Sequence, residues 1–231
     1  IVDSGVESIC ESRIQNLISY KDIQIEKWLI REPMLSEISD VVKYTDVSLN
    51  SEMATIRELD KEANKQNKVH KIILMYEIGD LREGCLREEL EHVIEESMQL
   101  KNIEVYGIGI NLSCYGEIIP TNENMQELDE LVKELEKKYN IKFKMVSGGN
   151  SSSYKMLKEG KLPRTINNLR LGESVFLGNV PCFDEKIENL NHDNFILEAQ
   201  IVELKEKSSV PKGTMGYANS FAEQTTFIDR G

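Results

Sequence analysis

The sequence of 231 residues predicts an α/β protein, a TIM-type (β/α)8 barrel that lacks its first βα unit and is followed by the start of a β-rich C-terminal domain. Three observations predict this fold. Seven strand-like segments follow one another, and six of them are joined by helical patterns of suitable length, an alternation that produces a parallel sheet. No GxGxxG fingerprint follows any of these segments, which disfavours a doubly wound open sheet. Two glycine-containing turns follow the last two strands, where such barrels place phosphate sites.

The first half of the chain alternates between short strands and amphipathic helices. Apolar side chains at helical spacing indicate a helix over 12–20. Pro33 opens a second helix, as proline at a first helical position permits, and Asn50 with Ser51 is expected to cap a third. Strands are expected at 6–10, 23–30, 46–49 and 69–78. The last of these is strongly apolar, as a buried parallel strand should be.

The second half continues the same alternation. Strands are expected at 103–111, 143–146 and 166–171, and helices at 86–100, 121–139 and 152–160. The helix over 121–139 has the most regular pattern, because its apolar residues Met125, Leu128, Leu131, Val132 and Leu135 recur in register. The last three segments frame the two glycine-containing turns.

These two turns are the strongest functional signal in the chain. The first is Ser147-Gly148-Gly149-Asn150-Ser151-Ser152-Ser153, and the second is Gly172-Glu173-Ser174. Glycine lets the backbone approach a ligand closely, and serine or asparagine at a helix start caps free N–H groups. Such turns can cradle an oxyanion such as phosphate. Two ordinary strand–helix turns are the alternative.

The charge and residue composition bear on which binding partners and which cellular location to expect. The net charge is −12, and the acidic excess lies largely on helix faces, so we expect neither nucleic-acid nor membrane binding. The four cysteines show no CxxC or disulfide-like spacing, which indicates a reducing, cytoplasmic location. No apolar run is long enough to span a bilayer. His70 and His192 are isolated, and neither has a metal-ligand set around it.

The pattern changes after Gly178. Residues 179–194 resemble a loop, 195–206 alternate as a long β segment, and 210–216 have turn chemistry. We therefore expect a barrel domain over 1–194 and the beginning of a β-rich domain over 195–231. The chain begins with Ile1 rather than methionine and ends within this second pattern, so both ends of the protein are expected to extend further.

Four segments carry a resemblance to a known family. They are SGGNSSS at 147–153, INNLRLGE at 166–173, EIGDLREG at 77–84 and PKGTMGY at 211–217. Together they resemble fold-type III pyridoxal-phosphate enzymes of the alanine racemase type, most closely the alanine/ornithine racemase branch. The resemblance covers essentially the whole chain. It implies a pyridoxal 5'-phosphate cofactor, a free amino acid as substrate and a homodimer.

The resemblance also implies roles for individual residues. Ser147, the backbone of Gly149, Asn150, Ser151 and Ser152, and the turn at Gly172 and Glu173 would hold the cofactor phosphate. Arg170 would face the pyridine nitrogen and, being always charged, would keep it unprotonated. Asn111 ends the strand expected at 103–111 and stands at the position where the family commonly carries a histidine stacked on the cofactor ring. Arg82 would lie near the cofactor's phenolic oxygen or the substrate carboxylate, with an ion pair to Glu83 or Asp80 as the alternative.

Racemisation requires a base on each face of a planar carbanion. In the family one base is the cofactor lysine and the other is a tyrosine, for which Tyr217 is the candidate. The lysine belongs to the first barrel strand, which precedes Ile1, so the chain as given is not expected to turn over. The segment 11–16 is also similar to single-domain pyridoxal-phosphate homeostasis proteins, which offers a non-catalytic cofactor carrier as the rival function. The β-like segment after Phe195 favours the racemase. Which amino acid it acts on is not readable from these residues.

Overall fold

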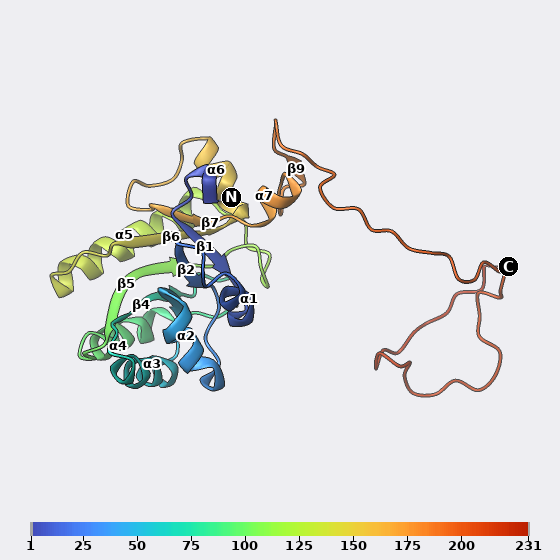
Figure 1. The fold of residues 1–231 in the computed structure, drawn as a ribbon. Coiled ribbons are helices and arrows are strands. Elements are labelled where there is room, and N and C mark those ends of the chain that lie inside the picture. The colour runs from blue at the N-terminus through green and yellow to red at the C-terminus, as the bar shows by residue number, and fades with distance from the viewer. Residues whose placement is uncertain (1, 231) are drawn as a thin grey trace. The chain divides into compact units, whose positions relative to one another are not determined.

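Seven strands form one parallel sheet in the computed structural model, which describes residues 2–230. They follow one another in the sheet in chain order, and every neighbouring pair is parallel (Figure 1). The strands are β1 (Ser8–Glu11), β2 (Glu26–Leu29), β3 (Val47–Asn50), β4 (His70–Tyr76), β5 (Ile103–Ile110), β6 (Met145–Asn150) and β7 (Asn168–Arg170). The predicted set of strands and their direction are confirmed.

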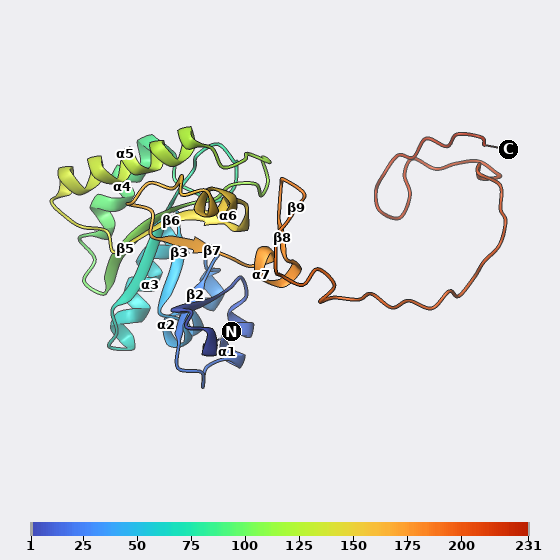
Figure 2. The ribbon, with the colours of Figure 1, turned by 90° about the horizontal axis from the view of Figure 1, so that it is seen from above.

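The sheet curves into a nearly closed barrel whose two edges are β1 and β7 (Figure 2). Within residues 2–230 no strand pairs with the outer edge of either one. Cys10 of β1 and Arg170 of β7 nevertheless lie close enough to influence each other's charge. The opening in the barrel therefore lies between the last and the first strand, the position that the element count predicts.

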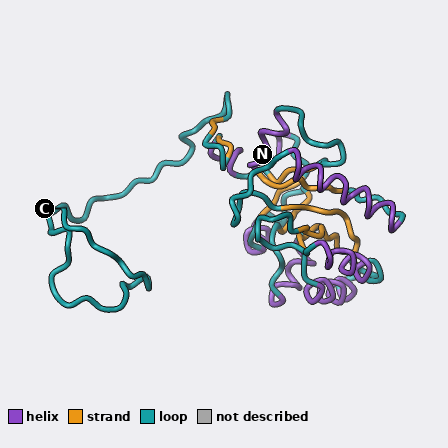
Figure 3. The backbone as a smooth tube through the Cα atoms, turned by 180° about the vertical axis from the view of Figure 1, so that it is seen from behind, coloured by secondary structure: helices purple, strands orange, loops and turns teal. Residues whose placement is uncertain are grey.

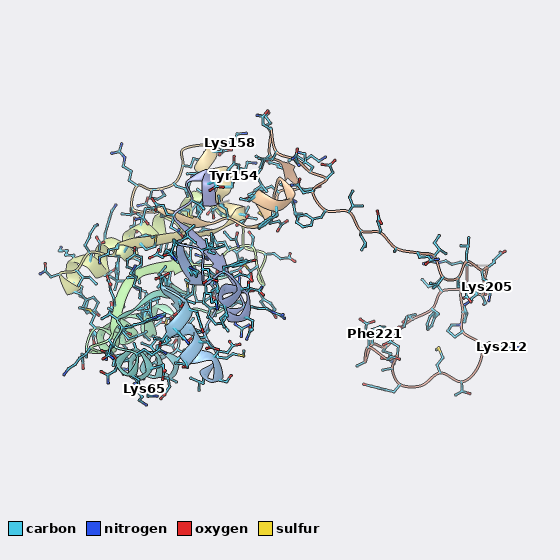
Figure 4. All side chains as sticks on the ribbon, viewed as in Figure 1. Lys65, Tyr154, Lys158, Lys205, Lys212 and Phe221 are labelled. Atoms are coloured by element: carbon cyan, nitrogen blue, oxygen red, sulfur yellow. The ribbon has the colours of Figure 1, made fainter. Side chains whose placement is uncertain are left out.

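Helices follow the strands and cover the outer face of the sheet (Figure 3). The inner sides of the helices and the outward-facing residues of the strands share one apolar core. Leu59 of the third helix and Ile72 and Leu74 of β4 belong to it. The outer sides are charged, as where Lys65 pairs with Glu62 (Figure 4). The helices are α1 (Ile14–Ser19), α2 (Ile38–Tyr44), α3 (Met53–Lys65), α4 (Arg87–Ser97), α5 (Asn122–Tyr139) and α6 (Tyr154–Lys158), with 3-10 turns η1 (Val2–Ser4), η2 (Leu35–Glu37) and η3 (Ser151–Ser153).

A second apolar cluster fills the inside of the barrel. It consists of strand residues only, namely Trp28, Val47, Leu49, Ile73 and Met75. Strand β4 contributes to both clusters because successive side chains point to opposite faces, which explains its continuous apolar run. In β5, a Cβ on Gly107 would lie 2.0 Å from the carbonyl oxygen of Met145. Only glycine allows β5 and β6 to pack this closely.

Charged residues close the interior at the amino ends of the strands. Glu26 accepts a hydrogen bond from Trp28 Nε1 at 2.8 Å and pairs with Lys71 Nζ at 2.7 Å. The same ammonium lies 4.8 Å from the centre of the Tyr106 ring. Glu26 and Lys71 share the inward faces of β2 and β4 with Trp28 and Ile73, two residues further along. Opposite charges are therefore matched at this end.

The helix starts agree with the sequence patterns in one case and differ in another. The helix predicted over 121–139 is present as α5, and Thr121 caps it, because its side chain accepts the N–H of Asn124. The cap predicted at Asn50 and Ser51 is wrong, since α3 begins at Met53 with Glu52 in the cap position and no side-chain cap. The carboxylate of Glu32 accounts for the difference. It accepts the N–H of Ser51 at 2.6 Å and the hydroxyl of Ser51 at 3.2 Å.

The chain divides into two units, Ile1–Asn194 and Phe195–Gly231. The first ends with α7 (Glu173–Leu177) and a small hairpin of β8 (Asn179–Val180) and β9 (Glu185–Lys186). The hairpin lies in the stretch 179–194, whose pattern predicts a loop. In the second unit, residues 195–230 contain no helix or strand, so the strand expected at 195–206 is wrong. A strand is stabilised by hydrogen bonds to a neighbouring strand, and among the described residues no strand forms in this segment or beside it. That these residues begin a β-rich domain stays a prediction.

Candidate functional site

Polar side chains gather at the carboxyl ends of β5, β6 and β7. Arg170, the last residue of β7, lies at their centre and is 8% exposed. Its guanidinium donates to Ser147 Oγ at 2.5 Å, to the carbonyl oxygen of Ile110 at 2.8 Å and to Asn111 Oδ1 at 2.8 Å. The Ser147 hydroxyl in turn donates to Asn168 Oδ1 at 2.6 Å. Three adjacent strands thus fix the orientation of one arginine.

The acceptors that surround Arg170 are uncharged. Among residues 2–230 it forms no ion pair, and its hydrogen-bond acceptors are a hydroxyl, a carbonyl and an amide oxygen. Burial lowers the pKa of Arg170 to about 10, so the guanidinium remains protonated at neutral pH. A buried cation without a counter-ion is costly, and such groups concentrate at functional sites.

The chain turns sharply after β6. Gly149 has a φ of +102°, a conformation that favours glycine, and a Cβ there would lie 3.0 Å from Ser153 Oγ. Asn150 caps η3, since its Oδ1 accepts the N–H of Ser152 at 2.9 Å and the hydroxyl of Ser152 at 2.7 Å. Ser151, Ser152 and Ser153 are all buried. The loop therefore turns its small polar groups inward.

Ser151 joins this loop to the turn that follows β7. Its hydroxyl oxygen accepts the N–H of Gly172, the N–H of Ser174 and the hydroxyl of Ser174, each at 3.1 Å. Gly172 is the cap residue of α7, so two of these donors belong to a helix start. Glu173, the first residue of that helix, is exposed. The two glycine-containing turns therefore meet at Ser151.

The donors at this junction fit a phosphate group. A phosphate oxygen carries more negative charge than a serine hydroxyl and would be the stronger acceptor for the N–H groups of Gly172 and Ser174. The adjacent Gly149 keeps the loop backbone free of a Cβ. The same residues also serve the alternative of ordinary turns, because each donor already has a partner in Ser151.

Arg82 reaches the same rim from the loop after β4. Its Nε donates to Glu83 Oε2 at 2.9 Å, and its Nη1 donates to Cys114 Sγ at 3.0 Å. Asn150 approaches from the other side, donating to the carbonyl oxygen of Leu112 at 2.7 Å and to Cys114 Sγ at 3.4 Å. The loops after β4, β5 and β6 are thus linked through one thiol. The ion pair to Glu83 expected as an alternative for Arg82 is present.

Asp80, the other acidic residue considered for Arg82, has a different role. It is 1% exposed, and its carboxylate accepts the N–H groups of Cys114 at 3.0 Å, Tyr115 at 3.2 Å and Ile118 at 3.2 Å. It therefore holds the loop after β5 against the loop after β4. No sequence signal marks this role, because the partners are backbone amides 34 to 38 residues away.

Two residues of the site, Asn168 and Cys114, received no role from the sequence, and Ser174 was named only as part of the second turn. Asn168 lies two positions before Arg170 and so on the same face of β7, a signal that could have found it. Ser174 completes the second turn and bonds to Ser151. Cys114 lies in a loop whose shape depends on Asp80, and nothing in its local sequence indicates that it contacts Arg82.

Tyr217 is the site candidate that lies outside the barrel unit. It belongs to Phe195–Gly231 and is 89% exposed, as its neighbour Phe221 is at 84% (Figure 4). Its catalytic role stays a prediction.

Within residues 2–230 no group of three or more His, Cys, Asp and Glu side chains is arranged to hold a metal ion. No helix in that range is long and apolar enough to cross a membrane.

Comparison with known proteins places the chain in context. The family model described as "Alanine racemase, N-terminal domain" matches residues 1–180. The chain is 47% identical over 227 residues to ornithine racemase of Acetoanaerobium sticklandii, covering 98% of this chain and 64% of that protein. It is 37% identical over 230 residues to lysine racemase of Thermotoga maritima, covering 99% of this chain and 64% of that protein. The chain thus spans less than two thirds of the length of both relatives.

A solved structure shares the fold. PipY of Synechococcus elongatus PCC7942, with PLP bound, aligns with a TM-score of 0.64 and 18% sequence identity. The alignment covers 76% of this chain and 84% of PipY. At this level of identity the likeness supports the barrel architecture alone.

Proposed function

Because this chain belongs to the family of alanine racemase N-terminal domains, we propose that it forms the cofactor-binding barrel of a pyridoxal-phosphate-dependent amino-acid racemase. The observation that carries the proposal is Arg170, a buried cation held by neutral acceptors beside two turns whose N–H donors suit a phosphate group. The names of the two relatives support a diamino acid such as ornithine or lysine as the substrate.

Pyridoxal phosphate would be held by residues of three adjacent strands. The cradle of Gly149, Asn150, Ser151 and Ser152, together with the turn at Gly172 and Glu173, would bind its phosphate. Ser147, whose hydroxyl accepts a hydrogen bond from Arg170, would also contact the phosphate. When bound, the cofactor supplies electron withdrawal that makes the substrate's Cα proton acidic.

Arg170 would face the ring nitrogen of the cofactor. A guanidinium donates hydrogen bonds but does not release its proton readily, so the ring nitrogen would stay unprotonated. Electron withdrawal would then be limited, which suits simple proton exchange at Cα. Asn111, bonded to Arg170 at 2.8 Å, would line the adjacent wall of the cofactor site. Arg82 would bind the phenolic oxygen of the cofactor or the substrate carboxylate.

Tyr217 would act as one of the two bases, reaching the mouth of a partner subunit's barrel in a homodimer. The cofactor lysine expected upstream of Ile1 would be the other. The four cysteines are all free, which supports a reducing cytoplasm as the location.

A non-catalytic cofactor carrier is the competing function. It is supported by the likeness to PipY, a barrel of similar extent with bound PLP. Against it stands the similarity to two racemases, whose alignments cover 98% and 99% of this chain and therefore extend beyond residue 195. A carrier and a racemase differ in whether they exchange the Cα proton of a free amino acid.

Chiral chromatography of the natural-length protein with L-ornithine, L-lysine and L-alanine tests the proposal. We expect racemisation of at least one of them by the wild-type protein. Replacing Tyr217 by Phe removes a positioned acid–base group and should lower the rate about a hundred- to ten-thousand-fold. Cofactor absorbance should be unchanged in this variant. Equal rates in both proteins would remove Tyr217 from the mechanism, and no racemisation by the wild type would favour the carrier.

A further inference from the structure

Three acidic side chains lie on the loop between β4 and α4, and they differ in how their oxygens are used. Glu77 accepts the N–H groups of Gly79 at 2.5 Å, Leu81 at 3.0 Å and Arg82 at 3.0 Å. Asp80 accepts backbone amides of the loop after β5 with both of its oxygens. These two carboxylates are therefore committed to the shape of their loops.

Glu83 differs from both. Its Oε2 accepts Arg82 Nε at 2.9 Å, whereas its Oε1 is buried and has no hydrogen-bond partner among the described residues. A buried carboxylate oxygen is unfavourable unless another group supplies a donor. The side chain as a whole keeps 25% exposure, and the terminal torsion of glutamate is broad, so a rotation of the carboxylate can turn the unpaired oxygen toward solvent. A ligand can reach that oxygen once the carboxylate has rotated.

The position of Glu83 connects it to the site. Its carbonyl oxygen accepts a hydrogen bond from Asn111 Nδ2 at 3.5 Å, and its carboxylate acts on the charge of Arg170. The same rim carries the guanidinium of Arg82. Two cations and one incompletely paired carboxylate therefore share the mouth of the barrel.

Ornithine and lysine each carry one carboxylate and two ammonium groups. The α-carboxylate matches an arginine, and the α-amino group is the one that reacts with the cofactor. The distal ammonium then requires an acceptor of its own, because leaving it unpaired in the site would be costly. A carboxylate with a spare oxygen gives it a charge-assisted hydrogen bond.

We propose that Glu83 determines specificity by accepting the distal ammonium of a diamino-acid substrate, an inference that rests on the racemase function proposed above. Oε2 keeps its contact with Arg82, and the other oxygen takes the ammonium. Neutral amino acids of the same length leave that oxygen unpaired, as it is in the free protein, and gain no hydrogen bond from it. The preference for the diamino acid therefore comes from a hydrogen bond that the neutral amino acid lacks.

The test compares Glu83→Gln with the wild type, using the natural-length protein loaded with pyridoxal phosphate. Kinetic constants are measured for L-ornithine and for L-norvaline, which has the same carbon chain without the distal amine. Apparent affinity for each is also measured from the change in cofactor absorbance on titration. Glu117→Gln is the matched control, because it removes one negative charge from an exposed position on the loop after β5.

Wild-type protein should prefer ornithine to norvaline at least tenfold in kcat/KM. In Glu83→Gln, kcat/KM and affinity for ornithine should fall about 10- to 100-fold, as for loss of a hydrogen bond between charged groups, with norvaline within about twofold. Glu117→Gln should resemble the wild type.

Three results would overturn the inference and leave the racemase function intact. They are an absent wild-type preference, an equal fall for both substrates, which would mean that Glu83 acts only by orienting Arg82, and no change for either substrate. If the wild type racemises no amino acid, the racemase function fails and the inference fails with it.

Discussion

The two ends of the barrel interior differ in how their charged side chains are paired. At the amino ends of the strands, Glu26 and Lys71 lie 2.7 Å apart as an ion pair, and Trp28 Nε1 supplies a further donor. At the carboxyl ends, Arg170 is buried among neutral acceptors, and one oxygen of Glu83 has no donor in the described part of the chain. One end has matched its charges within the chain, whereas the other has not.

This difference suggests that the charges at the amino end of the barrel serve stability, whereas those at the carboxyl end serve ligand binding. Matched charges need no ligand, so the amino end can be understood from the chain alone. Unmatched charges lower the stability of the protein by itself and are retained where a ligand supplies the missing partner. Barrels of this type place their active sites at the carboxyl ends of the strands, in agreement with this division. Variants at the two ends should therefore affect different properties.

The largest effect should follow from replacing Arg170 by Gln. The amide retains a donor for Asn111 or Ile110 but removes the positive charge from the ring-nitrogen position. We expect racemisation of L-ornithine to fall at least about a hundredfold, the scale of loss when one preorganised electrostatic group is removed. Chiral chromatography of the natural-length protein measures this fall.

The same variant should leave stability nearly intact. Relief from burying an uncompensated charge offsets the lost hydrogen bonds, so the free energy of unfolding should change by no more than about 1 kcal/mol. Urea unfolding followed by circular dichroism measures it. A loss of several kcal/mol with activity retained would show that Arg170 serves the fold, and the contrast between the two ends would not hold.

A smaller effect concerns His70, at the amino end of β4. Its Nε2 lies 2.9 Å from Ser48 Oγ, and burial lowers its pKa from 6.5 to about 4. The unfolded chain therefore binds a proton near pH 6.5, whereas the folded protein binds it only near pH 4. Stability is fully present above about pH 6.5 and falls as the pH decreases toward 4. Between pH 7.5 and pH 5 the loss from this group should be about 2 kcal/mol.

Urea unfolding of wild type and His70→Gln at both pH values isolates this contribution. Other groups titrate in the same range, so the informative quantity is the difference between the two proteins. His70→Gln should show a shallower decrease toward pH 5. Parallel pH profiles would mean that the buried imidazole is protonated without cost.

Sequence reasoning succeeded where local chemistry and long-range structure agree. The strands and helices follow from periodicity, and the order of the sheet follows from parallel crossovers. It failed at Ser51, where a carboxylate from another loop competes for the predicted cap, and at 195–206, where the described residues offer no neighbouring strand to the strand-like pattern. Periodicity reports which face of a segment is apolar, but it does not report what lies opposite.

The functional site, like the fold, was predictable from the sequence only in part. The two turns stand out because glycine, serine and asparagine follow two consecutive strands, and Arg170 is assigned through the family resemblance. Cys114 and the spare oxygen of Glu83 do not stand out, since each depends on loops brought together by Asp80 from a distance of 34 or more residues. Which carboxylate is saturated and which has a free oxygen is a property of the folded loops alone.

The smallest effect should come from the matched end, by replacing Lys71 with Met. The lysine and glutamate side chains are 33% and 25% exposed, so the pair is only partly screened from water. Removing the ammonium leaves Glu26 with Trp28 as its remaining partner, and the free energy of unfolding should fall by about 1 kcal/mol. Adding Glu26→Gln should recover part of that loss, because no unpaired charge then remains, and a double-mutant cycle gives the coupling. Racemisation should stay within about twofold of wild type in all three variants. A large fall in activity without a fall in stability would show that the two ends are coupled and that matched charges at one end help to hold the unmatched charges at the other.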